Sequence, residues 1–216
     1  MLRLLLARHG QTEWNALRRN QGQADTPMDE TGYRQARQLA AALAAEQIDA
    51  VYSSDLARCL ETARPIAEAA RIEPVADRRL QERDYGEWEG RTPDELEQED
   101  PQALAAYRAD PVLNGPTGGE TGIDVFCRAG YFLTDLLKAH SEGVVVVVAH
   151  GGSIAALLAA LLHGPPSTAT CFRLQNCSVS EVVLEADGVR RFVRFNDISH
   201  LAPAPLDWSR VQPTCK

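Results

Sequence analysis

The segment GVVVVVA at residues 143–149 constrains the fold of this chain more strongly than any other stretch of its sequence. An uninterrupted run of valines is typical of a strand that is buried on both faces, as in parallel sheets covered by helices. His150 and two glycines end the run, which is therefore too short for the ~20 apolar residues that span a membrane. A second apolar run, at residues 2–7, ends in the same way at His9 and a glycine. Both runs are predicted to be central strands whose last side chains enter loops.

Helical and extended patterns alternate through the first half of the chain. Helices are predicted at residues 33–47 and 56–70, and strands at residues 50–53 and 74–76. Ser54 or Asp55 is expected to cap the second of these helices. Such βαβ alternation is typical of a mostly parallel sheet with helices on both faces. The fold class that we predict is therefore α/β, a three-layer sandwich around a mostly parallel central sheet.

The middle of the chain, residues 92–118, departs from this alternation. Thr92 precedes a proline and is followed by Glu95, which together form a capping box at the start of a helix. Asp100 before Pro101 repeats the pattern of a cap followed by proline. We expect this segment to form short helices that lie over the sheet as a helical cap segment.

Longer elements return after this segment. A long helix is predicted from Thr121 to about His140, and another at residues 153–162. Extended runs on either side of Asp187-Gly188 predict a hairpin. The proline-rich tail after His200 is expected to pack as an irregular strap. Because the sequence contains no repeat or flexible linker, residues 1–216 are expected to form one domain.

Charge and cysteine content exclude several classes of partner. The chain has 30 acidic and 22 basic residues and a formal net charge of −8. This excess disfavours unspecific binding to nucleic acid or to an anionic membrane, so an anionic substrate needs a local group of cations. The five cysteines are odd in number and scattered, without the close pairs of a zinc site. We interpret them as reduced thiols, and with no signal-peptide pattern at the start we expect a cytoplasmic protein.

Chemically active side chains gather at the carboxyl ends of the predicted strands. Arg8 and His9 follow the first strand, and His150 follows the valine run. Arg58 lies in the first turn of the helix after residues 50–53, and side chains on a helix lean toward its amino end. Open α/β sheets bind ligands at this edge. Two histidines and two arginines therefore predict an anion-binding site.

The chemistry of such a site is narrow. Arginine offers a planar fork of donors to phosphate oxygens, and the amino end of the helix after His150 adds backbone N–H groups, with Gly151 as a predicted substrate-binding residue. Neutral imidazole is a competent nucleophile, so the set predicts phosphoryl transfer to a histidine nitrogen. The cations would stabilise charge on the equatorial oxygens of the phosphoryl group. We therefore expect no metal and no other cofactor.

A proton donor for the leaving oxygen is also needed. The segment LQERDYGEWEG offers Glu82, which follows an apolar leucine and precedes glycines that allow a tight turn. We predict that Glu82 is the general acid and base, and that it is protonated when substrate binds. Glu87 and Glu89 lie close in the sequence and are the alternatives.

Several of these segments occur together in one known family. ARHGQTEWN, QGQADTPMDETGYRQA, SSDLARCLETA, LQERDYGEWEG, GGET and VVVAHGG stand here in the order found in the histidine phosphatase superfamily, also called the phosphoglycerate mutase-like family. The chain resembles this family from Leu2 to about Leu162. The resemblance implies a phosphoglycerate mutase-like fold.

The resemblance also implies a role for individual residues. His9 is similar to the nucleophile that becomes phosphohistidine, and Glu82 to the proton donor. Arg8, Arg58 and His150 are similar to the residues of the phosphate pocket. Positions that line the same pocket in relatives are matched by Asn15, Gln21 and Gly22.

The chain departs from the family pattern at two places. Gln11 stands where glutamate is common after the RHG motif, and Met28-Asp29 stands where relatives often have leucine and then threonine or serine. We expect Gln11 to alter the conformation of its loop without abolishing the chemistry. Met28-Asp29 leaves open which residue caps the following helix.

Three functions follow from these residues. The first is hydrolysis of a small phosphate ester through a phosphohistidine intermediate, as in a metal-independent histidine phosphatase. The second is a mutase that returns the phosphoryl group to another substrate oxygen, although the mutases that this chain resembles are usually longer in the middle. The third is a noncatalytic protein that binds a phosphate ligand, against which the joint presence of His9, Glu82 and His150 argues. The expected partner is a small-molecule phosphate ester, and a homodimer is the expected assembly.

Overall fold

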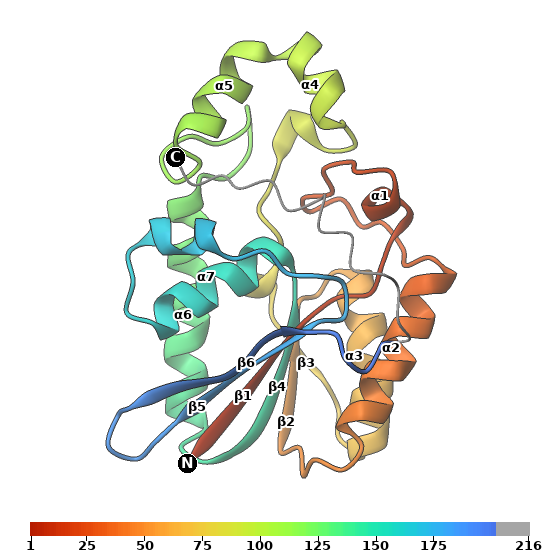
Figure 1. Ribbon diagram of the computed structural model, residues 1–216, viewed down its shortest axis with the longest axis vertical. Coiled ribbons are helices and arrows are strands. Elements are labelled where there is room, and N and C mark those ends of the chain that lie inside the picture. The colour runs from red at the N-terminus through yellow and green to blue at the C-terminus, as the bar shows by residue number, and fades with distance from the viewer. Residues whose placement is uncertain (202–216) are drawn as a thin grey trace.

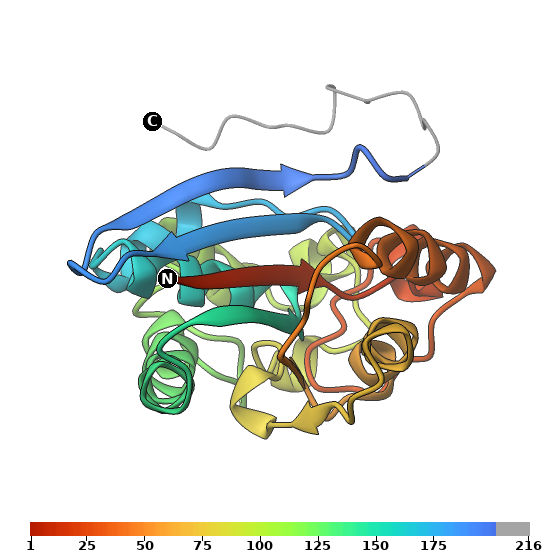
Figure 2. The same cartoon turned by 90° about the horizontal axis from the view of Figure 1, so that it is seen from below.

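One mixed sheet lies at the centre of the computed structural model, which describes residues 1–201. Within these residues the strand order is β3-β2-β4-β1-β5-β6, which can be followed in Figure 2. The strands are β1 (Leu2–Arg8), β2 (Ala50–Ser53), β3 (Val75–Ala76), β4 (Gly143–Ala149), β5 (Val179–Leu184) and β6 (Arg190–Asp197). Strands β1 to β4 run parallel to one another. At one edge of the sheet, β5 pairs antiparallel with β1, and β6 pairs antiparallel with β5. The expected mostly parallel sheet is confirmed.

Helices cover both faces of the sheet (Figure 1). They are α1 (Glu13–Ala16), α2 (Glu30–Leu43), α3 (Ala57–Ala70), α4 (Pro93–Glu99), α5 (Pro101–Ala109), α6 (Gly122–Ala139) and α7 (Gly151–Leu161), with 3-10 helices η1 (Arg78–Leu80), η2 (Gly86–Trp88) and η3 (Pro166–Cys171). Helices α6 and α7 pack on one face, and α2 and α3 on the other. The three-layer α/β architecture is therefore the one predicted. Among the residues described, no helix is both long and apolar enough to cross a membrane.

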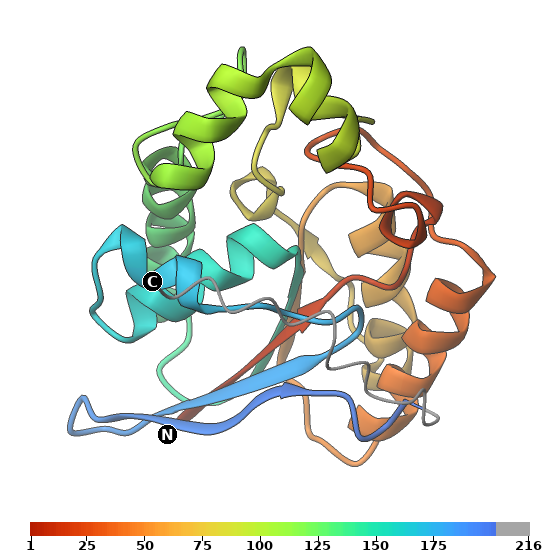
Figure 3. The same ribbon diagram turned by 45° about the horizontal axis from the view of Figure 1, so that its top comes forward.

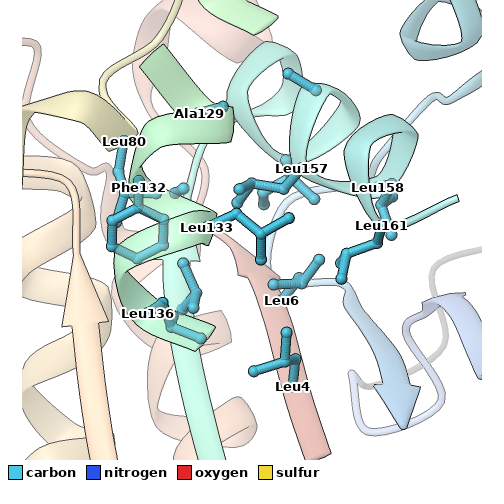
Figure 4. Close-up of a cluster of buried hydrophobic side chains, with 14 of the residues drawn as sticks. Leu4, Leu6, Leu80, Ala129, Phe132, Leu133, Leu136, Leu157, Leu158 and Leu161 are labelled. Carbon is cyan, nitrogen blue, oxygen red and sulfur yellow. The ribbon is translucent and has the colours of Figure 1, made fainter. Parts of the chain in front are cut away.

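Alternation along the central strands divides the core between these two faces. Leu4 and Leu6 of β1 face α6 and α7, as Figure 4 shows, whereas Leu5 faces α2 and α3. The valines of β4 alternate in the same way. Both faces bury apolar side chains, which is why these strands read as continuous apolar runs in the sequence.

The register between β1 and β4 places their carboxyl ends side by side. Arg8 pairs with Ala149 across this parallel pair. The next residues, His9 and His150, therefore leave the sheet from adjacent strands at the same level. In Figures 1 and 3, α4 and α5 lie beyond this end of the sheet, within the segment predicted to contain short helices.

Helix starts differ from the prediction because their caps were assigned incorrectly. Helix α2 covers residues 30–43 rather than 33–47, since the Asp29 carboxylate accepts from the Gly32 N–H and starts the helix earlier. The Gln11 side chain donates to the same carboxylate at 2.9 Å, so the two departures from the family pattern bind one another. Helix α7 begins at Gly151 rather than at residue 153, with His150 as its N-cap.

One predicted cap is wrong and another is only partly as expected. Neither Ser54 nor Asp55 caps α3 in the expected way, because its N-cap is Leu56 and the Ala57 N–H donates to Asp25, 2.8 Å away on another loop. Asp100 is the N-cap residue of α5, but its side chain makes no capping hydrogen bond and its carboxylate accepts from the Trp88 indole at 2.9 Å. In both cases a partner distant in sequence replaces the local one.

The remaining expectations have mixed outcomes. The capping boxes at Thr92 and Thr121 are present, and β5 and β6 form the predicted hairpin around Asp187-Gly188. The 3-10 helices were not predicted. The expected strap after His200 falls almost entirely on residues 202–216, which lie outside the described residues.

Gly32 generates a prediction about stability. It lies inside α2, where alanine normally stabilises a helix by up to ~1 kcal/mol over glycine. A Cβ at this position would collide with the backbone carbonyl of Gln11, in the loop that carries His9. We therefore expect Gly32→Ala to lower the free energy of unfolding by about 1–3 kcal/mol, as overpacking does, measured by urea denaturation.

Gly130 provides the matched control. It lies inside α6, and a Cβ there would meet no atom within 4 Å. Gly130→Ala should raise the free energy of unfolding by about 0.5–1 kcal/mol. Stabilisation by both substitutions would show that the loop does not depend on close approach at Gly32.

Candidate active site

His9 leaves β1 with its imidazole buried and fixed in one tautomer. Its Nδ1 lies 2.7 Å from the carbonyl oxygen of Gly10, and only 2% of the residue is exposed. Because a carbonyl oxygen only accepts, Nδ1 carries the proton and Nε2 keeps its lone pair. No side chain of the described residues bonds to Nε2, so this nitrogen is free to act as a nucleophile.

Neighbouring loops hold the backbone around His9. The side-chain amide of Asn176 donates to the carbonyl oxygen of His9 at 3.0 Å, and the Cys177 N–H donates to the same oxygen at 3.2 Å. The Gly10 N–H donates to the Thr62 hydroxyl on α3 at 3.0 Å. These contacts, which the sequence did not indicate, fix the direction of the imidazole from both sides.

His150 lies beside His9, as the strand register requires. The two ring centroids are 5.1 Å apart and the rings are tilted by 59°. Nδ1 of His150 accepts from the Arg58 guanidinium at 3.3 Å, and Nε2 lies 2.9 Å from the Ser54 hydroxyl. Since arginine only donates, Nε2 carries the proton of this second imidazole. Ser54 thus orients His150 rather than capping a helix.

Both imidazoles are neutral. Burial lowers the pKa of His9 well below its usual range, and the nearby positive charges of Arg8 and Arg58 lower it further. Burial also lowers the pKa of His150 well below its usual range, with Arg58 as the second cause. A neutral His9 retains the lone pair that nucleophilic attack requires.

Arg58 is fully buried, which is rare for an arginine. Its two terminal nitrogens donate to the carbonyl oxygens of Ala24 and Gly22, each at 2.7 Å. Gly22 has a φ of 54°, in the left-handed region that favours glycine. In this structure Gly22 therefore contributes a carbonyl group that positions Arg58.

Arg8 has a buried nitrogen without a partner. Its Nη1 donates to the carbonyl oxygen of Leu174 at 2.5 Å, whereas its Nε is buried and has no hydrogen-bond partner within residues 1–201. Burial lowers the pKa of Arg8, although the charge of Glu82 acts in the opposite direction. A buried unpaired donor is costly, so an anion that accepts from Nε would stabilise this site.

Glu82 reaches the same place from the loop between η1 and η2. Its two carboxylate oxygens accept from the Gly152 N–H at 3.0 and 3.1 Å, at the amino end of α7. A Cβ on Gly151 would lie 3.7 Å from this carboxylate and 3.8 Å from Nε of Arg8. Glu82 thus occupies the backbone donors that favour an anion, next to the unpaired donor of Arg8.

Asn15 and Gln21 lie at the edge of this group with their oxygens already bonded. Oδ1 of Asn15 accepts from the Thr12 N–H at 3.1 Å and from Asn176 at 3.1 Å. Oε1 of Gln21 accepts from the hydroxyls of Thr12 and Thr26, at 2.9 and 2.6 Å. Their amide N–H groups remain as donors.

The structure therefore brings together the side chains that the sequence singled out. His9, His150, Arg8, Arg58 and Glu82 arrive from two strand ends, the first turn of α3 and one loop. The alternatives to Glu82 lie elsewhere: Glu87 is exposed, and Glu89 accepts from the backbone of Gln23 at 2.6 Å. An unprotonated imidazole nitrogen here lies among two guanidinium groups, a helix terminus and a carboxyl group. Such a group of residues can accept a phosphoryl group, and its carboxyl group can donate or accept one proton.

The lowered pKa values predict how stability changes with pH. Because both histidines have a lower pKa in the folded protein than in the unfolded chain, acidification below about 6.5 protonates the unfolded chain first. Stability that is present at neutral pH is therefore lost as the pH falls. His150→Gln should reduce this loss between pH 6.5 and 5 by about 1 kcal/mol per pH unit, measured by urea denaturation across that range.

His163 supplies the control for this measurement. It is exposed and has a φ of 53°, a conformation that asparagine tolerates well. His163→Asn should leave the pH dependence of the unfolding free energy unchanged. Equal slopes for His150→Gln and the unaltered protein would contradict a buried neutral His150.

Comparison with known proteins identifies the family of this chain. The family model of the histidine phosphatase superfamily (branch 1) matches residues 4–198. Phosphoserine phosphatase 1 of Hydrogenobacter thermophilus is 36% identical over 185 residues, which cover 86% of this chain and 88% of that protein. A probable phosphoglycerate mutase of Proteus mirabilis is 34% identical over 223 residues, covering 96% and 98%. The structure of a mycobacterial glucosyl-3-phosphoglycerate phosphatase with VO3 has a TM-score of 0.82 at 36% identity, covering 90% of this chain and 98% of that one. This chain belongs to the histidine phosphatase superfamily, as its sequence motifs indicated.

Proposed function

We propose that this protein hydrolyses a small phosphate monoester through a phosphohistidine at Nε2 of His9. The observation that carries the proposal is the free lone pair of this nitrogen within a group of buried cations. Nδ1 is bonded to the Gly10 carbonyl, so attack by Nε2 needs no change of tautomer. The unpaired Nε of Arg8 provides a donor for a phosphate oxygen.

The first step transfers the phosphoryl group to the enzyme. The Nε2 lone pair forms a bond to phosphorus as the bond between phosphorus and the ester oxygen breaks. The electron pair of that bond goes to the leaving oxygen, which takes a proton from the carboxylic acid of Glu82. The alcohol then departs, and Glu82 is left as a carboxylate.

The second step returns the enzyme to its starting state. Glu82 removes a proton from water, whose oxygen forms a bond to phosphorus. The bond between phosphorus and Nε2 breaks, and its electron pair returns to His9. Arg8, Arg58 and the N–H groups at the start of α7 would stabilise the negative charge of the phosphoryl oxygens in both steps.

The substrate class follows from the relatives and from the cap. Two of the relatives are named as phosphatases, of phosphoserine and of glucosyl-3-phosphoglycerate, which are small phosphorylated metabolites. We propose that α4 and α5 cover the site and select the alcohol. Tyr107 packs against Trp88 with a centroid distance of 5.4 Å, and Arg108 pairs with Glu97 at 2.8 Å. These two side chains of the cap thus have protein partners.

Phosphate release tests the proposal directly. The protein should release inorganic phosphate from a panel of small phosphate esters, ranked by kcat/KM. His9→Asn removes the nucleophilic nitrogen, and we expect it to lower kcat by at least about 10³-fold. Thr170→Ala, an exposed change in η3, should leave kcat unaltered and serves as the control. Turnover that survives in His9→Asn would refute the phosphohistidine route.

A mutase is the second candidate, because a relative of nearly the same length is named a probable phosphoglycerate mutase. The two functions share the first step and differ in whether water or a substrate oxygen receives the phosphoryl group. If the protein interconverts 2- and 3-phosphoglycerate when primed with bisphosphoglycerate, and releases no phosphate from any ester, its function is that of a mutase. Binding of phosphate esters without either reaction would indicate a noncatalytic protein.

A further inference from the structure

Glu82 lies in a loop, outside the helices and strands. The proposed role of its carboxyl group needs placement within hydrogen-bond reach of the leaving oxygen. The contacts that hold its main chain therefore matter for the reaction. These contacts come from GGET, a segment of the sequence to which no role has yet been given, and from α6.

Arg128 of α6 makes the densest set of these contacts. Its guanidinium donates to the carbonyl oxygens of Arg79 at 2.9 Å, Gln81 at 2.6 Å and Glu82 at 2.8 Å. The side chain is 17% exposed. A guanidinium group is planar and rigid, so several bonds to neighbouring carbonyls fix the path of the chain between them.

Glu120, in GGET, holds the guanidinium from the other side. Its carboxylate accepts from Nε and Nη2 of Arg128, both at 2.8 Å. With these two bonds, all five N–H groups of Arg128 have acceptors. The Asp84 N–H also donates to Glu120, at 3.0 Å, so the carboxylate contacts the loop on the far side of Glu82.

The two segments approach closely because glycines line their contact. The Glu120 N–H donates to the Asp84 carbonyl oxygen at 2.9 Å, and the Glu87 N–H donates to that of Thr117 at 3.1 Å. A Cβ on Gly119 would collide with the backbone of Asp84, and one on Gly86 with that of Thr117. The GGET segment is thus built to lie against the loop of Glu82.

We propose that Glu120 and Arg128 are positioning residues that hold the carboxyl group of Glu82 over the amino end of α7, ready to protonate the leaving oxygen. This inference rests on the proposed function. A positioning role differs from a purely structural role in one measurable respect. Loss of positioning should slow the departure of alcohols that need a proton, and should spare leaving groups that depart as stable anions.

The test compares two esters with Arg128→Met, which keeps the aliphatic stem and removes the donors. For glycerol 2-phosphate, whose alcohol needs a proton, kcat/KM should fall about 10–100-fold, within the range that general acid catalysis supplies. For 4-nitrophenyl phosphate, which releases a stable phenolate, it should fall less than about threefold. The ratio kcat/KM is used because it reports the step in which the alcohol departs. The inhibition constant of inorganic phosphate should be unchanged.

Three further variants test whether the effect of Arg128→Met acts through Glu82. Glu82→Gln should also lower kcat/KM for glycerol 2-phosphate more than for 4-nitrophenyl phosphate. In the double variant of Glu82→Gln and Arg128→Met, the ratio of kcat/KM between the two esters should be the same as in Glu82→Gln alone. Glu120→Gln should reproduce the pattern of Arg128→Met in weaker form, and it keeps the hydrogen-bonding shape if Arg128→Met fails to fold.

Arg190→Met is the matched control. Arg190 also donates to backbone carbonyl oxygens, those of Ala160 at 3.2 Å and Leu161 at 2.9 Å, at the far end of α7. Arg190→Met should lower kcat/KM by the same factor for both esters, or leave both values unchanged. Equal losses on both esters in Arg128→Met and Glu120→Gln, or no loss in either, would overturn the inference. Absence of turnover in the unaltered protein would instead overturn the proposed function, and the positioning role with it.

Discussion

The parallel pairing of β1 with β4 is the constraint on which the site depends. Arg8 opposes Ala149 in this register, so each strand delivers a histidine to the same level of the same sheet edge. Both faces of the sheet are buried. A shift of this register by one residue would turn every apolar side chain of a strand toward the opposite, wrong face. The packing of the core and the geometry of the two imidazoles are therefore fixed by one set of backbone hydrogen bonds. The short distance between ring centroids, 5.1 Å, follows from it.

Electrostatic balance around these imidazoles explains how a buried site can attract an anion in an acidic protein. Arg58 is fully buried and donates to carbonyl oxygens and the His150 ring, and Arg8 keeps one buried donor without a partner among the described residues. The same positive charges lower the pKa of His9 and keep it neutral. The Glu82 carboxylate accepts from the Gly152 N–H at the start of α7. A bound phosphoryl group would supply the negative charge that these donors favour.

The sequence predicted the layers of the fold and the side chains that meet, because both follow from local patterns. Valine runs indicated buried strands, and His-Gly at two strand ends indicated a shared edge. Contacts between segments distant in the chain were not predictable in this way. Asp25 caps α3 from another loop, Ser54 binds His150, and Asn176 holds the backbone of His9. The GGET motif was visible in the sequence, but its contact with Arg128 depends on how α6 packs against the loop of Glu82.

In the proposed reaction, Nε2 of His9 receives the phosphoryl group while Nδ1 stays bonded to the Gly10 carbonyl. Rapid quenching in alkali during turnover, followed by peptide mass spectrometry and phosphorus NMR, identifies the phosphorylated atom. We expect a phosphoramidate on His9, bonded at Nε2, that accumulates and decays at rates consistent with turnover. A phosphate at Nδ1, on His150 or on no residue during active turnover would contradict it.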